Sequence, residues 1–277
     1  MKMLRTKRSV DFEQYFTDAT LAAKCLAAVC ARYDLASFNW VLEPSAGDGV
    51  FFKLLPEKNR IGIDIMPLCE GVEEMDFFRW EPPLFEDNIL TIGNPPFGQR
   101  GSQAIAFMNR ACEFSRVIAF IVPRSFKKDT FMNRVNPNFH LVEQFDCSEF
   151  RSPEGLRLEV KSVFQIWARR KEQRVEIQRS REHEDFDLKH AHLSRITSEE
   201  LSRLVADYEF AIAQVGSNFV PKEPHTLTAG SYWFVRANKP GVREVFERLD
   251  FSFLDGLNLS FTSLSKKDII QAYESAR

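Results

Sequence analysis

Residues 41–49 read VLEPSAGDG, in which an apolar run leads directly into a loop of small residues. The run predicts a short buried strand over residues 40–42, and Gly47 and Gly49 let the backbone after it turn sharply. A helix-like segment, residues 50–55, follows. A strand, a glycine turn and a helix in this order are typical of the first unit of an open parallel sheet that binds a ligand at the turn.

The surrounding sequence continues this alternation of strands and helices. Apolar runs predict strands over residues 60–65, 88–93 and 117–122, and a capped helical pattern covers residues 18–33 before the glycine loop. Residues 102–114 have the pattern of a crossover helix. Residues 140–145 and 160–168 predict an antiparallel hairpin at the sheet edge. The first part of the chain is therefore expected to be an α/β domain with a mostly parallel sheet.

Two acidic residues follow the glycine loop at the ends of the next two strands. Asp64 closes the strand over residues 60–65, about 20 residues beyond the turn, where an acid binds a ribose diol in such sheets. Asp76, in the sequence MDFF, is placed to accept a hydrogen bond from an exocyclic amine, with Phe77 beside the ring.

Residues 93–98 read GNPPFG and come directly after the strand over residues 88–93. Two prolines remove two backbone donors, so the carbonyls of Asn94 and Pro95 are expected to point outward with no local N–H to bind. Together with the Asn94 side-chain oxygen they form a group of acceptors beside the ring of Phe97. This arrangement suits a planar substrate that carries an NH₂ group, at the sheet edge where open α/β sheets bind ligands.

These motifs resemble those of the S-adenosylmethionine-dependent amino-methyltransferases, and most closely the N6-adenine methyltransferases. EPSAGDG is similar to their cofactor loop, IGIDI to their acidic second strand, MDFF to their third, and NPPF to their catalytic tetrapeptide. QYFTDATLAAKCL, from Gln14, resembles the segment before the loop, with Asp18 where proline is usual. The motif order resembles the gamma group of DNA methyltransferases. The resemblance covers about residues 12–170.

The resemblance implies a Rossmann-like class I methyltransferase fold, with a seven-stranded, mostly parallel sheet and an antiparallel edge hairpin. It implies S-adenosylmethionine as the cofactor and transfer of its methyl group to the N6 amine of adenine in nucleic acid, with DNA favoured over RNA. Catalysis is assigned to Asn94, Pro95, Pro96 and Phe97. Cofactor binding is assigned to Phe16, Thr17, Glu43, Ala46, Gly47, Gly49, Asp64, Ile65, Asp76, Phe77 and Asn94.

Further basic residues follow the predicted strands on the same sheet edge. Arg100 adjoins the tetrapeptide, and Arg124, Lys127 and Lys128 follow the strand over residues 117–122; all four are candidates for contacting phosphates. The formal net charge of the 277 residues is −2, which excludes a protein that coats nucleic acid through charge alone. Phenylalanine is abundant, with 26 residues, most of them expected in the core.

The five cysteines form no CxxC pair, so neither a disulfide framework nor a metal site is expected. The N-terminus lacks the apolar core of a signal peptide and no run is long enough to span a bilayer, which predicts a cytoplasmic or nuclear protein without membrane contact.

A charged stretch over residues 169–187 predicts a boundary between a methyltransferase domain, residues 1–172, and a C-terminal α+β extension, residues 173–277, for substrate recognition. A helix over 198–208, a strand over 232–235 and a helix over 266–273 are expected there.

Three other functions remain open on the sequence. In the first, the methyl acceptor is adenine in RNA, and in the second it is the glutamine amide of a protein. In the third, the fold has lost its chemistry and only binds a ligand. Phenylalanine at position 97, where tyrosine is common in the glutamine-modifying relatives, and the C-terminal extension favour a base. The intact set of Gly47, Asp64, Asp76 and Asn94 favours an enzyme. A protein partner or a dimer is compatible with each.

Overall fold

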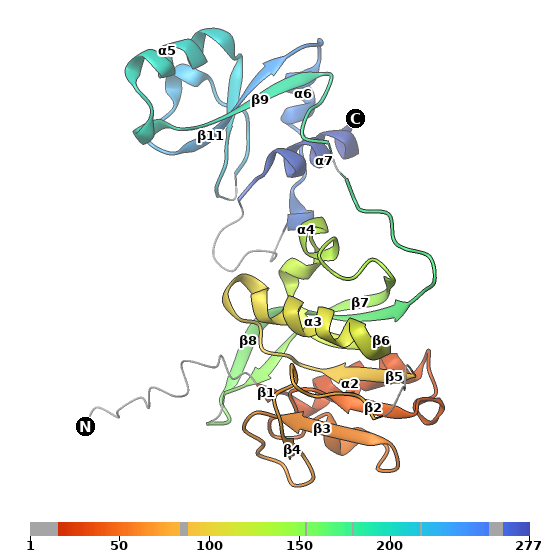
Figure 1. Ribbon diagram of the computed structural model, residues 1–277. Coiled ribbons are helices and arrows are strands. Elements are labelled where there is room, and N and C mark those ends of the chain that lie inside the picture. Colours follow the sequence, from red (N-terminus) through yellow and green to blue (C-terminus); the bar gives the residue numbers. More distant parts are fainter. Residues whose placement is uncertain (1–15, 84–87, 153, 179, 217, 255–262) are drawn as a thin grey trace, which may run out of the picture. The chain divides into compact units, whose positions relative to one another are not determined.

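The computed structural model describes residues 16–83, 88–152, 154–178, 180–216, 218–254 and 263–277 (Figure 1). Gln14 and Tyr15, which begin the segment that resembles the methyltransferase motif before the glycine loop, lie outside these residues. The chain divides into two compact units, of which the first ends at Ile177 and the second begins at Gln178. The division falls within the charged stretch over residues 169–187, five residues beyond the boundary expected after residue 172.

Hydrogen bonds tie residues 173–177 to the first unit. The Arg174 guanidinium donates to the backbone carbonyls of Met132, Val135 and Phe139 at 2.8, 2.9 and 2.7 Å. The Asn133 side chain accepts from the N–H of Ile177 and donates to its carbonyl. These partners are far apart in the sequence, so composition alone did not reveal them.

Within the described residues of the first unit, eight strands form one sheet in the order β1-β7-β8-β6-β5-β2-β3-β4. Strands β6, β5, β2, β3 and β4 are parallel to one another, and β8 runs antiparallel to both β6 and β7. This confirms the expected Rossmann-like α/β fold, with a mostly parallel sheet, an antiparallel edge hairpin and one strand more than the seven expected. The bounds are β1 Phe16–Thr17, β2 Trp40–Glu43, β3 Arg60–Asp64, β4 Glu73–Glu74, β5 Ile89–Gly93, β6 Ser115–Pro123, β7 Phe139–Arg151 and β8 Arg157–Arg169.

The additional strand exists because the edge hairpin is longer than predicted. Strands β7 and β8 stay paired as far as Arg151 and Arg157, where the sequence suggested a polar loop. The end of β7 then offers a free edge, and β1 pairs with it in antiparallel register. Polar residues are compatible with a strand here because side chains alternate between two faces and one face meets solvent.

The two faces of the sheet are covered by different helices. Along β6, Ile118, Phe120 and Val122 pack in one apolar cluster with helix α3, Ser102–Phe114. The intervening residues of β6 pack in a second cluster with helix α2, Ala19–Cys30. This alternation explains why the strand is a continuous apolar run, since both of its faces are buried.

Helix α3 has the bounds predicted for the crossover helix, whereas α2 is shorter than the predicted residues 18–33. Asp18 caps α2 by accepting a hydrogen bond from the N–H of Thr20 at 2.9 Å. The segment after the glycine loop is a single 3₁₀ turn, η2, Phe52–Leu54, rather than a longer helix. Phe51 and Leu55, which flank this turn, are buried, and Pro56 prevents its extension.

The second unit contains a three-stranded antiparallel sheet in the order β10-β11-β9, which agrees with the expected α+β region. The predicted helices and strand are confirmed, and both α5 and α7 begin with capping boxes. No helix in the described parts of the chain is long and apolar enough to cross a membrane. The bounds are β9 Phe186–His192, α5 Ser198–Asp207, β10 Phe210–Ala213, β11 Ser231–Ala237, α6 Val242–Phe246 and α7 Lys266–Ala276.

Candidate functional site

The glycine loop follows β2 and needs both of its glycines. Gly47 and Gly49 have φ values of +50° and +77°, a region that residues with a Cβ rarely adopt. A Cβ on Gly49 would lie 2.4 Å from the sulfur of Cys69, and one on Gly47 would lie 3.2 Å from the ring of Phe16. The loop is therefore sharply turned and closely packed against Phe16 and Cys69.

Gly49→Ala is expected to destabilise the protein by about 2–3 kcal/mol, because it combines the unfavourable φ with a steric clash. Gly155→Ala is the matched control, since Gly155 has a φ of +82° but nothing within 4 Å of the added Cβ. This control should cost only about 1 kcal/mol. Urea unfolding of both variants measures the difference. Equal losses of stability would contradict the close packing of Gly49 on Cys69.

Asp64, the last residue of β3, connects the second strand to the glycine loop. One of its carboxylate oxygens accepts a hydrogen bond from the N–H of Gly47 at 2.8 Å, and the other accepts from the N–H of Met66 at 2.8 Å. Each oxygen keeps acceptor capacity for a ligand, because a carboxylate offers about four acceptor sites. The predicted ribose-binding acid thus lies directly against the predicted cofactor loop.

The Asn-Pro-Pro-Phe segment leaves the end of β5 and leads into α3. The carbonyl of Phe97 accepts from the N–H groups of Gln103 and Ala104 at 3.2 and 3.3 Å, which anchors the segment to the start of the helix. The carbonyl of Asn94 has a donor from elsewhere in the chain that the sequence did not indicate, because the Ser45 hydroxyl donates to it at 3.2 Å. This hydroxyl comes from the glycine loop, so it ties the two loops together.

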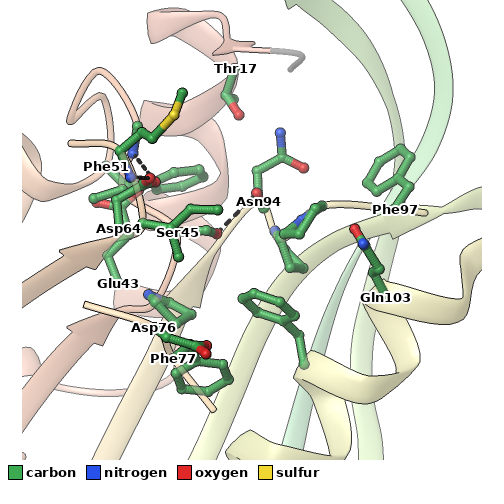
Figure 2. Close-up of a pocket in the computed structure, with 18 of the residues that line it drawn as sticks. Thr17, Glu43, Ser45, Phe51, Asp64, Asp76, Phe77, Asn94, Phe97 and Gln103 are labelled. Atoms are coloured by element: carbon green, nitrogen blue, oxygen red, sulfur yellow. Dashed lines mark hydrogen bonds between the residues drawn. The ribbon is translucent and has the colours of Figure 1, made fainter. Parts of the chain in front are cut away.

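A cavity of about 490 Å³ lies between these loops (Figure 2). Figure 2 shows Asp64 and Glu43 on one side and Phe97 and Gln103 on the other, with Asn94 between them. Gly49 supports the loop without lining the cavity. The predicted site residues that line it are Phe16, Thr17, Glu43, Ala46, Gly47, Asp64, Ile65, Asp76, Phe77, Asn94, Pro95, Pro96 and Phe97.

Among the lining residues that the sequence analysis did not assign to the site are three with large or polar side chains. Phe107 and Gln103 come from α3, and Phe78 follows Phe77. Phe77 is only 1% exposed, because the ring of Phe107 stacks on it at 5.0 Å, whereas Phe78 is 48% exposed. Phe78 therefore offers the more open aromatic surface. Helical spacing of Gln103 and Phe107 just after the tetrapeptide was the available signal.

The ionisable side chains that line the cavity, within the described residues, are all acidic: Glu43, Asp48, Asp64 and Asp76. Such a lining favours a cationic ligand or one with hydroxyl donors. Glu43 is 2% exposed, and no described residue hydrogen-bonds to its Oε2. Burial raises the pKa of Glu43 well above its ordinary value of 4.5, against a lowering effect of a backbone hydrogen bond with Phe52, and Asp48 and Asp64 raise it further.

Glu43→Gln is expected to remove a pH-dependent loss of stability. Below the unfolded pKa, near 4.5, both states of the wild type keep the proton, and above it only the folded state does. Wild-type stability relative to Glu43→Gln should therefore fall as pH rises from 4.5 toward the raised folded pKa. Thermal unfolding across this range measures it, with the exposed Glu57→Gln as the control. Parallel curves for wild type and Glu43→Gln would contradict a protonated Glu43.

The four basic residues proposed for phosphate contact do not line the cavity. Arg124 and Lys127 form ion pairs with Asp146, which lies on β7. Burial raises the pKa of Asp146, but hydrogen bonds from Arg124 and Lys127 outweigh this effect and hold it below its ordinary value. Arg100 is exposed and has a φ of +53° between Gly98 and Gly101.

No family model matches the chain, and no curated protein matches it. Solved structures that it resembles include a candidate RNA methyltransferase from Pyrococcus horikoshii, with 19% identity, a TM-score of 0.46, and 61% of this chain and 93% of the other covered. A structure from a type I R-M system has 12% identity, a TM-score of 0.42, and coverages of 60% and 44%. The 23S rRNA methyltransferase ErmE has 16% identity, a TM-score of 0.41, and coverages of 94% and 98%. At these identities and TM-scores, no substrate is carried over to this chain.

Proposed function

We propose that the protein is an S-adenosylmethionine-dependent methyltransferase that modifies the N6 amine of adenine in nucleic acid, with DNA as the favoured substrate. The observation that carries this proposal is one cavity lined on one side by the glycine loop and its carboxylates and on the other by Asn94, Pro95, Pro96 and Phe97. A cofactor side and an acceptor side thus meet where a methyl group would be passed between them.

The residues of the first side fit this cofactor. Asp64 retains acceptor capacity for ribose hydroxyls, and Ile65, which is 51% exposed, offers an apolar surface for an adenine ring. The carboxylates of Asp48, Asp64 and Asp76 in the lining suit the positive charges of an ammonium and a sulfonium group. Bound there, S-adenosylmethionine would supply an electrophilic methyl group.

The residues of the second side suit an amine acceptor. The side-chain oxygen of Asn94 and the carbonyl of Pro95 would accept the two amine hydrogens, and Phe97 would stack on the base. These acceptors draw the hydrogens out of the ring plane, so the nitrogen lone pair is less delocalised and attacks more readily. They also face the positive charge that develops on nitrogen. The methylated nitrogen then loses its proton easily, so no strong base is required.

Phe97 offers an aromatic face for a base, and stacking on an aromatic residue contributes about 1–3 kcal/mol per base. A base in a duplex must be flipped out to enter the cavity, at a cost of a few kcal/mol. The net charge of −2 fits a local contact of Arg100, Arg124, Lys127 and Lys128 with phosphates rather than a broad basic surface.

The test is transfer of a radiolabelled methyl group to unmethylated DNA, to RNA and to protein extracts, followed by nucleoside and amino-acid analysis. Labelled N6-methyladenine from DNA supports the full proposal. Labelled N6-methyladenine from RNA alone supports the chemistry and replaces the substrate. Label on protein glutamine overturns the adenine assignment, and cofactor binding without transfer to any pool indicates a binding module.

A further inference from the structure

Arg151 ends β7 and lies beside the two-residue strand β1, which forms part of the cavity wall. Its Nη2 donates to the carbonyl of Thr17 at 3.3 Å and lies 3.5 Å from the carboxylate of Asp48, and its Nε lies 3.9 Å from the carboxylate of Asp18. We propose that Arg151 is a positioning residue that holds Phe16 and Thr17 against the glycine loop and thereby sets cofactor affinity. The link to the cofactor rests on the proposed function.

Within the described residues, the backbone pairing of the wall that Arg151 supports is short. There, strand β1 pairs with β7 through Phe16 and Thr17, and the next backbone bond joins the N–H of Asp18 to the carbonyl of Glu149 at 3.3 Å. Phe16 nevertheless covers Gly47 closely, and Thr17 is 2% exposed, so both are fixed in the cavity wall. A pairing of two residues orders a segment weakly by itself. The contacts of the Arg151 guanidinium with Thr17 and Asp48 add to it.

Charge explains why a cation is needed at this point. Asp18 caps α2, directly after β1, and Asp48 belongs to the glycine loop. The two carboxylates therefore lie on the two segments that Arg151 joins. Without Arg151 the two carboxylates repel each other across the junction. The planar guanidinium has several N–H groups, so it contacts one carbonyl and two carboxylates at the same time. The compact ammonium group of a lysine does not match this geometry.

The decisive experiment compares Arg151→Gln with Arg157→Gln. Arg157 faces Arg151 across the hairpin and is exposed, so the control removes the same charge from the same place in the fold. For Arg151→Gln we expect the Asp18 amide to exchange its hydrogen about tenfold faster and the Kd for S-adenosylmethionine, by calorimetry, to rise about tenfold. The kcat at saturating cofactor should change by less than about twofold, because the acceptor side is untouched.

Each outcome separates this inference from the proposed function. Faster Asp18 exchange with a raised Kd and an unchanged kcat supports it. Unchanged exchange of the Asp18 amide overturns the positioning role of Arg151. Faster exchange with an unchanged Kd overturns the link between Arg151 and the cofactor. An equal rise of the Kd in Arg157→Gln overturns this link as well. A wild type that binds no S-adenosylmethionine overturns the proposed function, while amide exchange still decides the role of Arg151. If Arg151→Gln does not fold, Arg151→Lys, which keeps the charge but not the planar guanidinium, is judged by the same measurements.

Discussion

Replacing Asn94 with alanine is expected to lower the rate of methyl transfer at saturating cofactor and substrate by about 10²–10³-fold, the usual loss when one preorganised polar group is removed from a reacting centre. The Asn94 side chain is the acceptor that the tetrapeptide places at the middle of the cavity, whereas the backbone carbonyls remain after the substitution. Cofactor binding should change by less than about threefold, because Asp64 and the glycine loop are untouched.

The matched control for Asn94→Ala is Asn88→Ala. Asn88 directly precedes the first residue of β5, at the end of the strand opposite Asn94, and its side chain donates to the carbonyl of Ser37 at 2.7 Å. The variant therefore measures the effect of losing an asparagine away from the cavity. Single-turnover transfer and calorimetric cofactor binding should be measured for both. Wild-type turnover in Asn94→Ala would contradict the proposed acceptor site.

Replacing Asp64 with alanine is expected to weaken S-adenosylmethionine binding by about 100-fold, or roughly 2.7 kcal/mol. The variant loses the acceptors for ribose hydroxyls and also the hydrogen bonds from the N–H groups of Gly47 and Met66. The second loss releases the glycine loop from β3, so the ligand would also have to order the loop on binding. Calorimetry measures the Kd directly.

Asp64→Asn and Asp34→Ala separate these causes. The amide keeps one acceptor but presents N–H donors to a backbone N–H, so its Kd should lie between those of wild type and Asp64→Ala. Asp34 accepts from the N–H of Ala36 at 3.0 Å in a similar local turn, away from the cavity, and its removal should leave the Kd unchanged. A Kd within about threefold of wild type for Asp64→Ala would exclude Asp64 as the ribose-binding acid.

Much of the first unit could be predicted because its central strands are buried on both faces. Apolar runs such as those of β5 and β6 have no other stable place in a soluble fold, so their positions and parallel order followed from the pattern. The site was predictable for a related reason. Glycine at positive φ and proline without a donor restrict the backbone locally, and the loops that carry them sit at one edge of a parallel sheet.

The edge of the sheet was harder to predict. The first five residues of β8 alternate between exposed and half-buried side chains, a pattern that a polar loop also shows. The pairing of β7 with β1 depends on a partner more than 100 residues away. The contact of Ser45 with Asn94 and the exposed ring of Phe78 depend likewise on how distant loops pack.

The sequence by itself determined the sheet, the glycine loop and the tetrapeptide, because hydrophobic periodicity and the backbone restrictions of glycine and proline act over a few neighbouring residues. Only the tertiary structure decided what joins these pieces: Ser45 against Asn94, and Arg151 between Asp18 and Asp48. Those contacts depend on distances between segments far apart in the chain, and such distances exist only once the core has packed.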